Sequence, residues 1–279
     1  MNLFLSVGAM KAGTTWLYSQ LESHPDLYFT PEKEIHFLNH FYVNNKILKD
    51  EFRLNQARNK LKNINISHIG VYRMLSRWYA MYLEKPDDFS WYERLFSLNK
   101  NQKFNCDFSN LSCHLEREHW IDLKNRGYNL KLIYVLRDPV RRLWSHLKFH
   151  HEFLGKSLDF HTWSVNKFKE FISRKFIWDN CTYTNYISEM SEVFDNNEFQ
   201  LLYFEDITSN PTVELYRIED FLQVRHHTYD PNRLEKKVNV SKKISVPNNF
   251  LIAANQMLAT EYNGLEKLGV RIHESWETV

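Results

Sequence analysis

A strand, a glycine turn and a helix follow one another at the start of the chain. After two residues the sequence reads LFLSVGAMKAGTTWLYSQL. A turn between a buried strand and a helix exposes backbone N–H groups at the positive end of the helix dipole, which forms an anion site. Gly8 and Gly13 let the backbone approach a phosphate closely. Lys11 adds a mobile positive charge, and Thr14 and Thr15 add hydroxyl donors. This stretch therefore predicts a phosphate loop.

The position of the lysine separates this loop from that of nucleoside triphosphatases. In the GxxxxGK[ST] loop the lysine directly follows the second glycine. Here Lys11 precedes Gly13 instead, and the chain has no GK[ST] sequence. A magnesium-dependent P-loop kinase or triphosphatase is therefore the weaker alternative, and a different phosphate ligand is expected.

Apolar segments that alternate with helical ones predict an α/β fold. LFLSV, LKLIYVL and FQLLYF read as buried strands, and LYF at 27–29 as a short one. Residues 43–100 are expected to be mostly helical. A further helix begins after Asp138, a good N-cap, with Pro139 at its first position. The pattern favours a single P-loop-like domain over 1–279, with a central, mainly parallel sheet flanked by helices.

A second constellation follows the strand LKLIYVL. Ligands of parallel sheets bind at the carboxyl ends of the strands, and Arg137 lies at such an end. Arg141 precedes Ser145 by one helical turn, on the same face of the predicted helix. A guanidinium with a nearby hydroxyl suits a phosphate dianion. Arg142 is expected to lie on the solvated face of this helix.

The net charge of the chain limits the kinds of partner that it is expected to bind. The chain has 36 basic and 34 acidic residues, a net charge of +2. This balance lacks the basic excess of a dedicated nucleic-acid binder. No apolar run approaches the ~20 residues of a membrane helix, and the first strand begins at once. The expected partner is a small molecule rather than nucleic acid or a membrane, and the expected location is cytoplasmic.

Neither a disulfide framework nor a metal site is expected. Cys106, Cys113 and Cys181 are odd in number and lack CxxC spacing. His146 and His150 stand one helical turn apart, as metal ligands can, but no third ligand is apparent and a neighbouring lysine indicates a solvated face.

Together these stretches resemble the sulfotransferases that use 3′-phosphoadenosine 5′-phosphosulfate (PAPS). GAMKAGTT resembles the family's GxxKAGTT loop, and RDPVRRLWS its RDPxxRxxS segment. Between them, PEKEIHFLNHFY at 31–42 is similar to the KExHFF segment of the branch that includes heparan sulfate sulfotransferases and bacterial relatives. Weaker matches keep the family's order along nearly the whole chain: SWYERLF, LLYFEDITSNP, FLQV and NVSKKISVP.

The resemblance implies how the donor is held. Lys11 would stabilise the charge that develops on the leaving phosphate during in-line transfer of the sulfuryl group. The backbone of Ala12 to Thr15 would bind the 5′-phosphate, and Arg137 with Ser145 the 3′-phosphate. A phosphosulfate has no β- and γ-phosphates for a metal to bridge, so no metal is required.

Three further residues are assigned to the nucleotide. Trp16 directly follows the loop and is the aromatic residue expected to stack on adenine. Lys242 and Lys243 belong to the late basic loop and take the place of an arginine that is common there.

The segment EKEIHF supplies the expected acceptor-side residues. In the resembling branch the glutamate that matches Glu34 is the usual proposed general base, so Glu34 is the expected base. His36 is the alternative, because the ordinary pKa of a histidine, ~6.5, suits the role; it can equally be a hydrogen-bonded structural residue. Lys33 would lean toward the sulfuryl group or the acceptor. A non-catalytic nucleotide-binding module leaves Glu34 and Lys33 unexplained.

The acceptor itself is only broadly defined. A hydroxyl, or as second choice an amine, of a carbohydrate or small metabolite is expected. The family usually has GExSPxYL before its second phosphate motif, whereas this chain has CDFSNLSCHL at 106–115. Asp107 and Ser109 remain, and Phe108 stands where some relatives have lysine, so the acceptor is not carried over from the resemblance.

Overall fold

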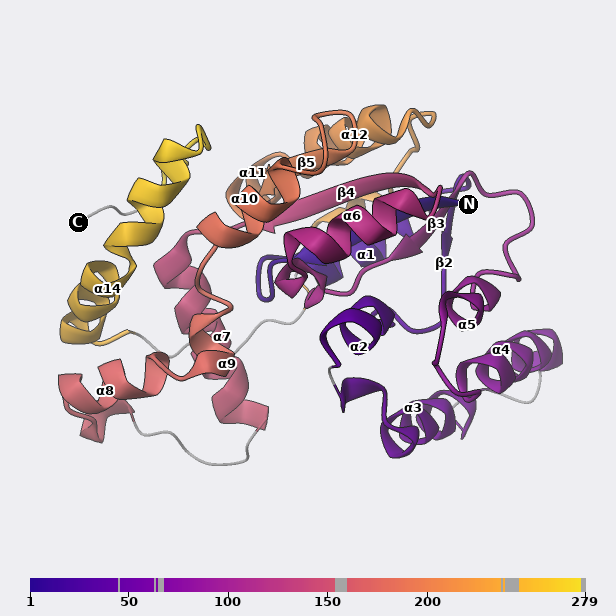
Figure 1. The fold of residues 1–279 in the computed structure, drawn as a ribbon, viewed down its shortest axis with the longest axis horizontal. Helices are drawn as coiled ribbons and strands as arrows, with labels where there is room; N and C mark the ends of the chain where they lie inside the picture. Colours follow the sequence, from indigo (N-terminus) through magenta and orange to yellow (C-terminus); the bar gives the residue numbers. More distant parts are fainter. Residues whose placement is uncertain are drawn as a thin grey trace.

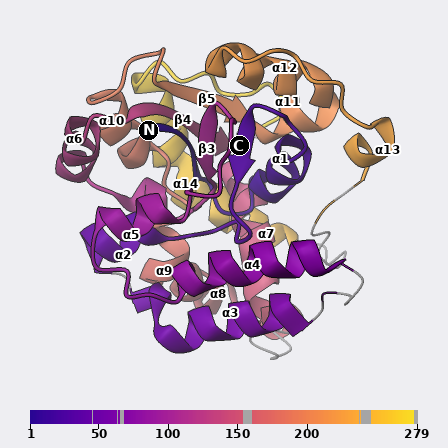
Figure 2. The same cartoon turned by 90° about the vertical axis from the view of Figure 1, so that its right-hand side faces the viewer.

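A five-stranded parallel sheet forms the centre of the computed structural model, which describes residues 1–44, 46–62, 64, 68–153, 160–236, 238 and 246–276. The strand order is β2-β3-β1-β4-β5, and each neighbouring pair is parallel. Helices cover both faces: α1 and α12 lie on one face, and α6 and α10 on the other (Figure 2). The predicted fold class is confirmed. The strands are β1 (Asn2–Gly8), β2 (Leu27–Phe29), β3 (Phe104–Asp107), β4 (Asn129–Leu136) and β5 (Phe199–Tyr203).

The helices lie around the sheet in groups that follow the chain order. The segment between β2 and β3 carries α3, α4 and α5 to one side of the molecule, while α7, α8 and α14 lie on the opposite side (Figure 1). Their bounds are α1 (Thr14–Leu21), α2 (Phe37–Val43), α3 (Asp50–Lys62), α4 (Ile69–Tyr82), α5 (Phe89–Arg94), α6 (Arg117–Asn125), α7 (Pro139–Phe153), α8 (Val165–Ile172), α9 (Lys175–Trp178), α10 (Thr184–Ser191), α11 (Phe204–Ser209), α12 (Pro211–Leu222), α13 (Pro231–Leu234) and α14 (Asn248–Lys267). Short 3₁₀ turns occur at Lys46–Leu48, Ser112–His114 and Phe160–Thr162.

Burial explains why two of the strands are apolar, but one buried strand, β3, has a polar sequence. β1 and β4 are nearly continuous apolar runs because helices cover both of their faces. β3 is equally buried, yet it reads FNCD and was not expected as a strand. Its polar side chains are satisfied locally: Asn99 donates to the Asn105 side chain at 2.7 Å, and Tyr92 donates to Asp107 at 2.9 Å. These partners let polar residues occupy an interior strand.

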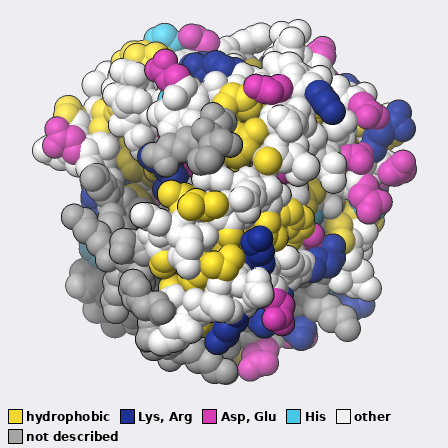
Figure 3. Space-filling view, turned by 90° about the vertical axis from the view of Figure 1, so that its left-hand side faces the viewer, with side chains coloured by type: hydrophobic (Ala, Val, Ile, Leu, Met, Phe, Trp, Pro, Cys, Tyr) yellow, Lys and Arg dark blue, Asp and Glu magenta, His cyan; other side chains and the backbone are white. Residues whose placement is uncertain are grey.

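The surface on the α14 side has mixed character. Hydrophobic side chains gather in the middle of this face, and charged side chains of both signs lie around them (Figure 3). No helix in the described part of the chain is long and apolar enough to cross a lipid bilayer.

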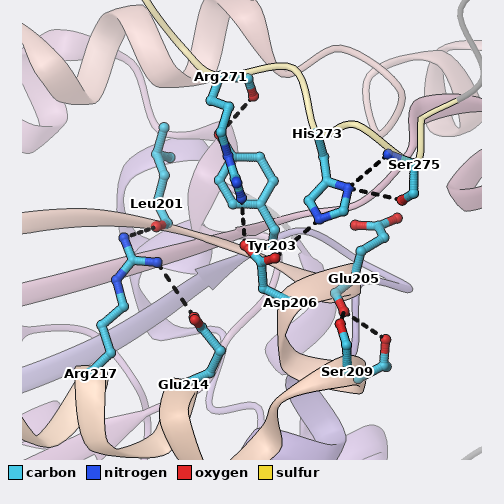
Figure 4. A network of polar contacts seen from close by, with 11 residues as sticks. Leu201, Tyr203, Glu205, Asp206, Ser209, Glu214, Arg217, Arg271, His273 and Ser275 are labelled. Atoms are coloured by element: carbon cyan, nitrogen blue, oxygen red, sulfur yellow. Dashed lines mark hydrogen bonds and ion pairs between the residues drawn. The ribbon is translucent and has the colours of Figure 1, made fainter.

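A polar network anchors the segment that follows α14 to the end of β5 (Figure 4). Tyr203 donates to the Arg271 carbonyl at 2.8 Å, and the Arg271 guanidinium lies 2.5 Å from Asp206. His273 contacts the same carboxylate at 3.1 Å. Glu205, the neighbour of Asp206, accepts the backbone N–H of Asp138 at 3.0 Å. Glu205 and Asp206, which follow β5, therefore fix the start of α7 and the segment at Arg271 and His273.

Candidate active site

The loop after β1 lies at the carboxyl end of the sheet, as predicted. The Ala9 N–H donates to the Val135 carbonyl of β4 at 3.1 Å, which ties the loop to the neighbouring strand. Gly13 is the N-cap of α1, with a left-handed φ of 89°, and among the described residues no side chain caps this helix. The Trp16 N–H donates to the Gly13 carbonyl at 2.9 Å, so in the described structure the N–H groups of Thr14 and Thr15 are the ones available to an anion.

Gly13 is required for both its backbone conformation and its missing side chain. A Cβ at this position would lie 2.9 Å from Cδ2 of Phe204, at a φ that other residues rarely adopt. We expect Gly13→Ala to lower the free energy of unfolding by about 1–3 kcal/mol, measured by urea denaturation. Adding Phe204→Leu should restore only the steric part of that loss. Wild-type stability of the Gly13→Ala variant would contradict this role.

Arg137 connects the end of β4 to the loop. Its Nη1 donates to the Lys11 carbonyl at 2.9 Å, and its guanidinium lies 4.4 Å from the centre of the Phe204 ring. Burial lowers the pKa of Arg137, and its Nε has no hydrogen-bond partner in the described structure. The following helix begins as predicted, because Asp138 accepts the Arg141 N–H at 2.8 Å. Arg137 directly follows β4, as predicted, and holds the loop through its hydrogen bond to the Lys11 carbonyl.

Lys11 projects from the loop toward α7. Its backbone is left-handed, with a φ of 67°, and its ammonium lies 4.7 Å from the centre of the Phe149 ring. A cation over an aromatic face at this distance is held by the ring quadrupole. The neighbouring Ala12 is fully buried, so the loop backbone is fixed while the lysine side chain projects from it.

The predicted acceptor-side residues meet the phosphate loop. Lys33 Nζ lies 2.9 Å from Glu34 Oε1 and 3.4 Å from the hydroxyl of Thr14. The other carboxylate oxygen of Glu34 contacts His36 Nε2 at 3.1 Å. Asn110 donates to Glu34 Oε1 at 3.1 Å. A carboxylate, an ammonium and an imidazole thus stand in contact beside Thr14 in the loop after β1.

The charge of Glu34 is strongly stabilised. Burial by itself raises the pKa of this carboxyl, but the hydrogen bond from His36 and the charge of Lys33 outweigh it and lower the pKa to about 2. A lowered folded-state pKa adds stability above the ordinary value of 4.5, and this stability is lost as the pH falls from 4.5 toward 2.

This pKa shift predicts a pH-dependent difference in stability. At pH 7, Glu34→Gln should unfold with about 1 kcal/mol less free energy than the wild type, and the difference should shrink between pH 4.5 and pH 3. Urea denaturation across this range measures it. A difference that grows toward acid pH would show that the carboxylate is not stabilised in the fold.

His36 is held by its backbone as well as by its ring. It is the N-cap residue of α2, with a φ of 58°, and its N–H donates to the Ser109 hydroxyl at 2.8 Å. Ser109 in turn donates to Asp107 at 2.5 Å. His36 is 8% exposed, and its ring contacts the Glu34 carboxylate directly. Asn110 was not predicted as a site residue, because it lies in the segment where the chain departs from the family pattern.

Two expectations for α7 were wrong. Arg142 was expected on a solvated helix face but is fully buried, and its Nη1 lies 3.4 Å from the Met10 carbonyl. His146 is 1% exposed, and its Nε2 lies 2.8 Å from that of His150. The helices α9 and α14 pack against α7, so part of its surface is covered, while Arg141 remains exposed. The signal for Arg142 was present, since it occupies the second arginine of RDPxxRxxS.

The remaining residues singled out in the sequence differ in burial, and two of them lie outside the described part of the chain. Ser145 is buried on α7 at 9% exposure, and Arg141 is exposed. Trp16 is half-buried against the core at the start of α1. Lys242 and Lys243 lie outside the described residues. Within the ranges that the structure describes, no three His, Cys, Asp or Glu side chains form a possible metal site.

Comparison with known proteins assigns the family. The family model described as "Sulfotransferase family" matches residues 4–228, which include the phosphate loop, the Lys33–His36 segment and the start of α7. The chain belongs to the sulfotransferase family. Sulfuryl transfer is therefore its general activity. No curated protein sequence shows significant similarity to it.

Solved structures of other sulfotransferases share the fold. The sulfotransferase from Alicyclobacillus acidocaldarius is 20% identical, with a TM-score of 0.68 over 99% of this chain and 98% of that one. The sulfotransferase domain of the Synechococcus PCC 7002 olefin synthase is 16% identical, with a TM-score of 0.56 over 92% of this chain and 94% of that domain.

Proposed function

We propose that this sulfotransferase moves a sulfuryl group from PAPS to a hydroxyl, or as second choice an amine, of a carbohydrate or small-metabolite acceptor. One observation carries the proposal: Lys33 bridges the Glu34 carboxylate and the Thr14 hydroxyl of the phosphate loop. A base and an anion site in contact are the two parts that sulfuryl transfer to an O–H group requires.

The donor would be held by the loop and the end of β4. The N–H groups at Ala12–Thr15 would bind the 5′-phosphate, and Arg137 with Ser145 the 3′-phosphate. Lys11 would move from the Phe149 ring to the bridging oxygen, where charge develops as the S–O bond breaks. The proposed roles of Trp16, Lys242 and Lys243 toward the nucleotide rest on the sequence.

Glu34 would act as general base. The acceptor oxygen forms a bond to sulfur while its proton passes to Glu34, and the bond from sulfur to the phosphate oxygen breaks to leave adenosine 3′,5′-bisphosphate (PAP). A carboxylate with a pKa near 2 is a weak base before the substrates bind. The sulfonate of the donor would draw Lys33 away from Glu34, and loss of that charge raises the pKa of Glu34 when the base is needed.

Turnover tests the proposal directly. Purified protein is incubated with PAPS and a panel of sugars and hydroxylated metabolites, and PAP release and sulfated product are followed by chromatography and mass spectrometry. Acceptor-dependent PAP release is the expected result. Magnesium-dependent ATP hydrolysis without sulfation would favour the kinase or triphosphatase class. Nucleotide binding without transfer to any acceptor would favour a binding module.

A further inference from the structure

Arg142 is a buried positive charge directly behind the phosphate loop. Its side chain has no solvent exposure, and its Nη1 lies 3.4 Å from the carbonyl of Met10, the residue before Lys11. Its Nε and Nη2 have no well-aligned hydrogen-bond partner in the described chain, and the one polar side chain that interacts with the guanidinium at close range there is the Cys181 thiol, a weak and uncharged partner. A guanidinium stays protonated in proteins, so this charge persists although it is out of water.

The groups around Arg142 do not neutralise it. The groups that act on its charge are the thiols of Cys113 and Cys181 and the hydroxyls of Tyr134 and Tyr183. The centre of the Tyr183 ring lies 5.8 Å from the guanidinium. These groups raise the pKa of Arg142 against the effect of burial, but only in their ionised forms. Burial raises the pKa of each of these four groups, so all are uncharged at pH 7. Among the described residues no carboxylate forms an ion pair with Arg142. A buried charge without a partner costs stability.

The positive charge of Arg142 acts on ionisable groups near the phosphate loop. Burial, followed by the charges of Arg142, His150 and Lys11, lowers the pKa of His146 on α7 to about 2 and keeps this histidine neutral. Arg137, which donates to the Lys11 carbonyl, feels the same cation. The acids Glu205 and Asp138 act on Arg137, whereas no carboxylate in the described part of the chain forms an ion pair with Arg142.

We propose that the phosphates of the bound nucleotide are the missing counter-charge of Arg142. Arg142 is then a positioning residue: it acts across the loop backbone, which it holds at Met10, without touching the ligand. A unit charge in a poorly polarisable interior acts over several ångströms. The empty protein bears an unfavourable buried charge, and nucleotide binding relieves it. The inference rests on the proposed function only in taking the ligand to be a bisphosphate nucleotide.

Two variants separate charge from shape. Arg142→Met removes the charge and keeps an apolar chain of related length, whereas Arg142→Lys keeps the charge. For Arg142→Met we expect a urea midpoint of the empty protein equal to or above that of the wild type. By calorimetry its Kd for PAP should rise by about tenfold or more, with a weaker dependence on salt concentration. Arg142→Lys should keep most of the affinity. The control, Arg58→Met, removes an exposed arginine on α3 and should change neither quantity.

Specific outcomes overturn the inference. Arg142→Met binding PAP as tightly as the wild type would show that the charge is not felt by the ligand. Arg142→Met unfolding at lower urea than the wild type, or failing to fold, would show that Arg142 is compensated in the empty protein. If the wild type itself binds no PAP, the proposed donor is wrong; inorganic pyrophosphate is then titrated into the same proteins. Equal pyrophosphate affinity in wild type and Arg142→Met rejects the counter-charge role, and weaker binding by the variant supports it.

Discussion

Replacing Lys11 with alanine is expected to lower kcat by about 10²–10³-fold, because one positioned donor to a developing oxyanion contributes about this much. The loop backbone and Arg137 remain in Lys11→Ala, so the Kd for PAP should rise far less than kcat falls. Steady-state PAP release, together with calorimetric titration of PAP, separates the two effects. A loss in kcat without a matching loss in product binding is the signature of a group that acts mainly in the transition state.

The control for Lys11→Ala is Lys100→Ala. Lys100 is an exposed lysine just before β3, at the amino ends of the strands and away from the phosphate loop. It should keep wild-type kcat. Urea denaturation of both variants should give wild-type midpoints within error. If Lys11→Ala turns over at the wild-type rate, the assignment of the leaving-group role to Lys11 is wrong.

Replacing Glu34 with glutamine is expected to lower kcat by about 10²–10⁴-fold, the usual contribution of a general base. Glutamine keeps the size of the side chain and can still accept a hydrogen bond, but it cannot take the acceptor proton. PAP binding should be nearly unchanged, since the loop and Arg137 hold the nucleotide. The matched control is Glu118→Gln on α6, which removes an exposed carboxylate and should leave kcat unchanged.

His36→Gln distinguishes the two candidate bases. In the structure His36 contacts Glu34 at 3.1 Å and is held at the start of α2 by Ser109. If it orients the carboxylate, His36→Gln should cost about tenfold or less in kcat, well below the loss in Glu34→Gln. A larger loss in His36→Gln than in Glu34→Gln would assign the base to His36.

Much of the architecture was predictable because its signals are local. The glycine turn, the apolar strands β1, β4 and β5, and the Asp138–Pro139 helix start depend on residues within a few positions of one another. β3 could not be predicted in this way. Its FNCD sequence resembles a polar loop, and only partners such as Asn99 and Tyr92 make it an interior strand.

The candidate site likewise contains residues that local motifs identify and residues that only tertiary contacts identify. Lys11, Glu34 and Arg137 stand out in the sequence because they belong to short motifs with fixed spacing. Asn110 does not, since its contact with Glu34 joins residues 76 positions apart. The solvated face expected for Arg142 and His146 was wrong because the helices that cover α7 are distant in sequence.

The sequence alone determined that this chain forms a parallel sheet with a glycine turn after its first strand, and from this pattern it predicted a phosphate loop with Lys11, Arg137 and Glu34 around it. Backbone sterics and the alternation of apolar segments act between near neighbours, so they can be read along the chain. Only the tertiary structure decided that Lys33 joins Glu34 to Thr14 and that Arg142 lies buried behind Met10 with no carboxylate partner among the described residues. Burial and charge pairing depend on which distant segments pack together, and no local pattern records that.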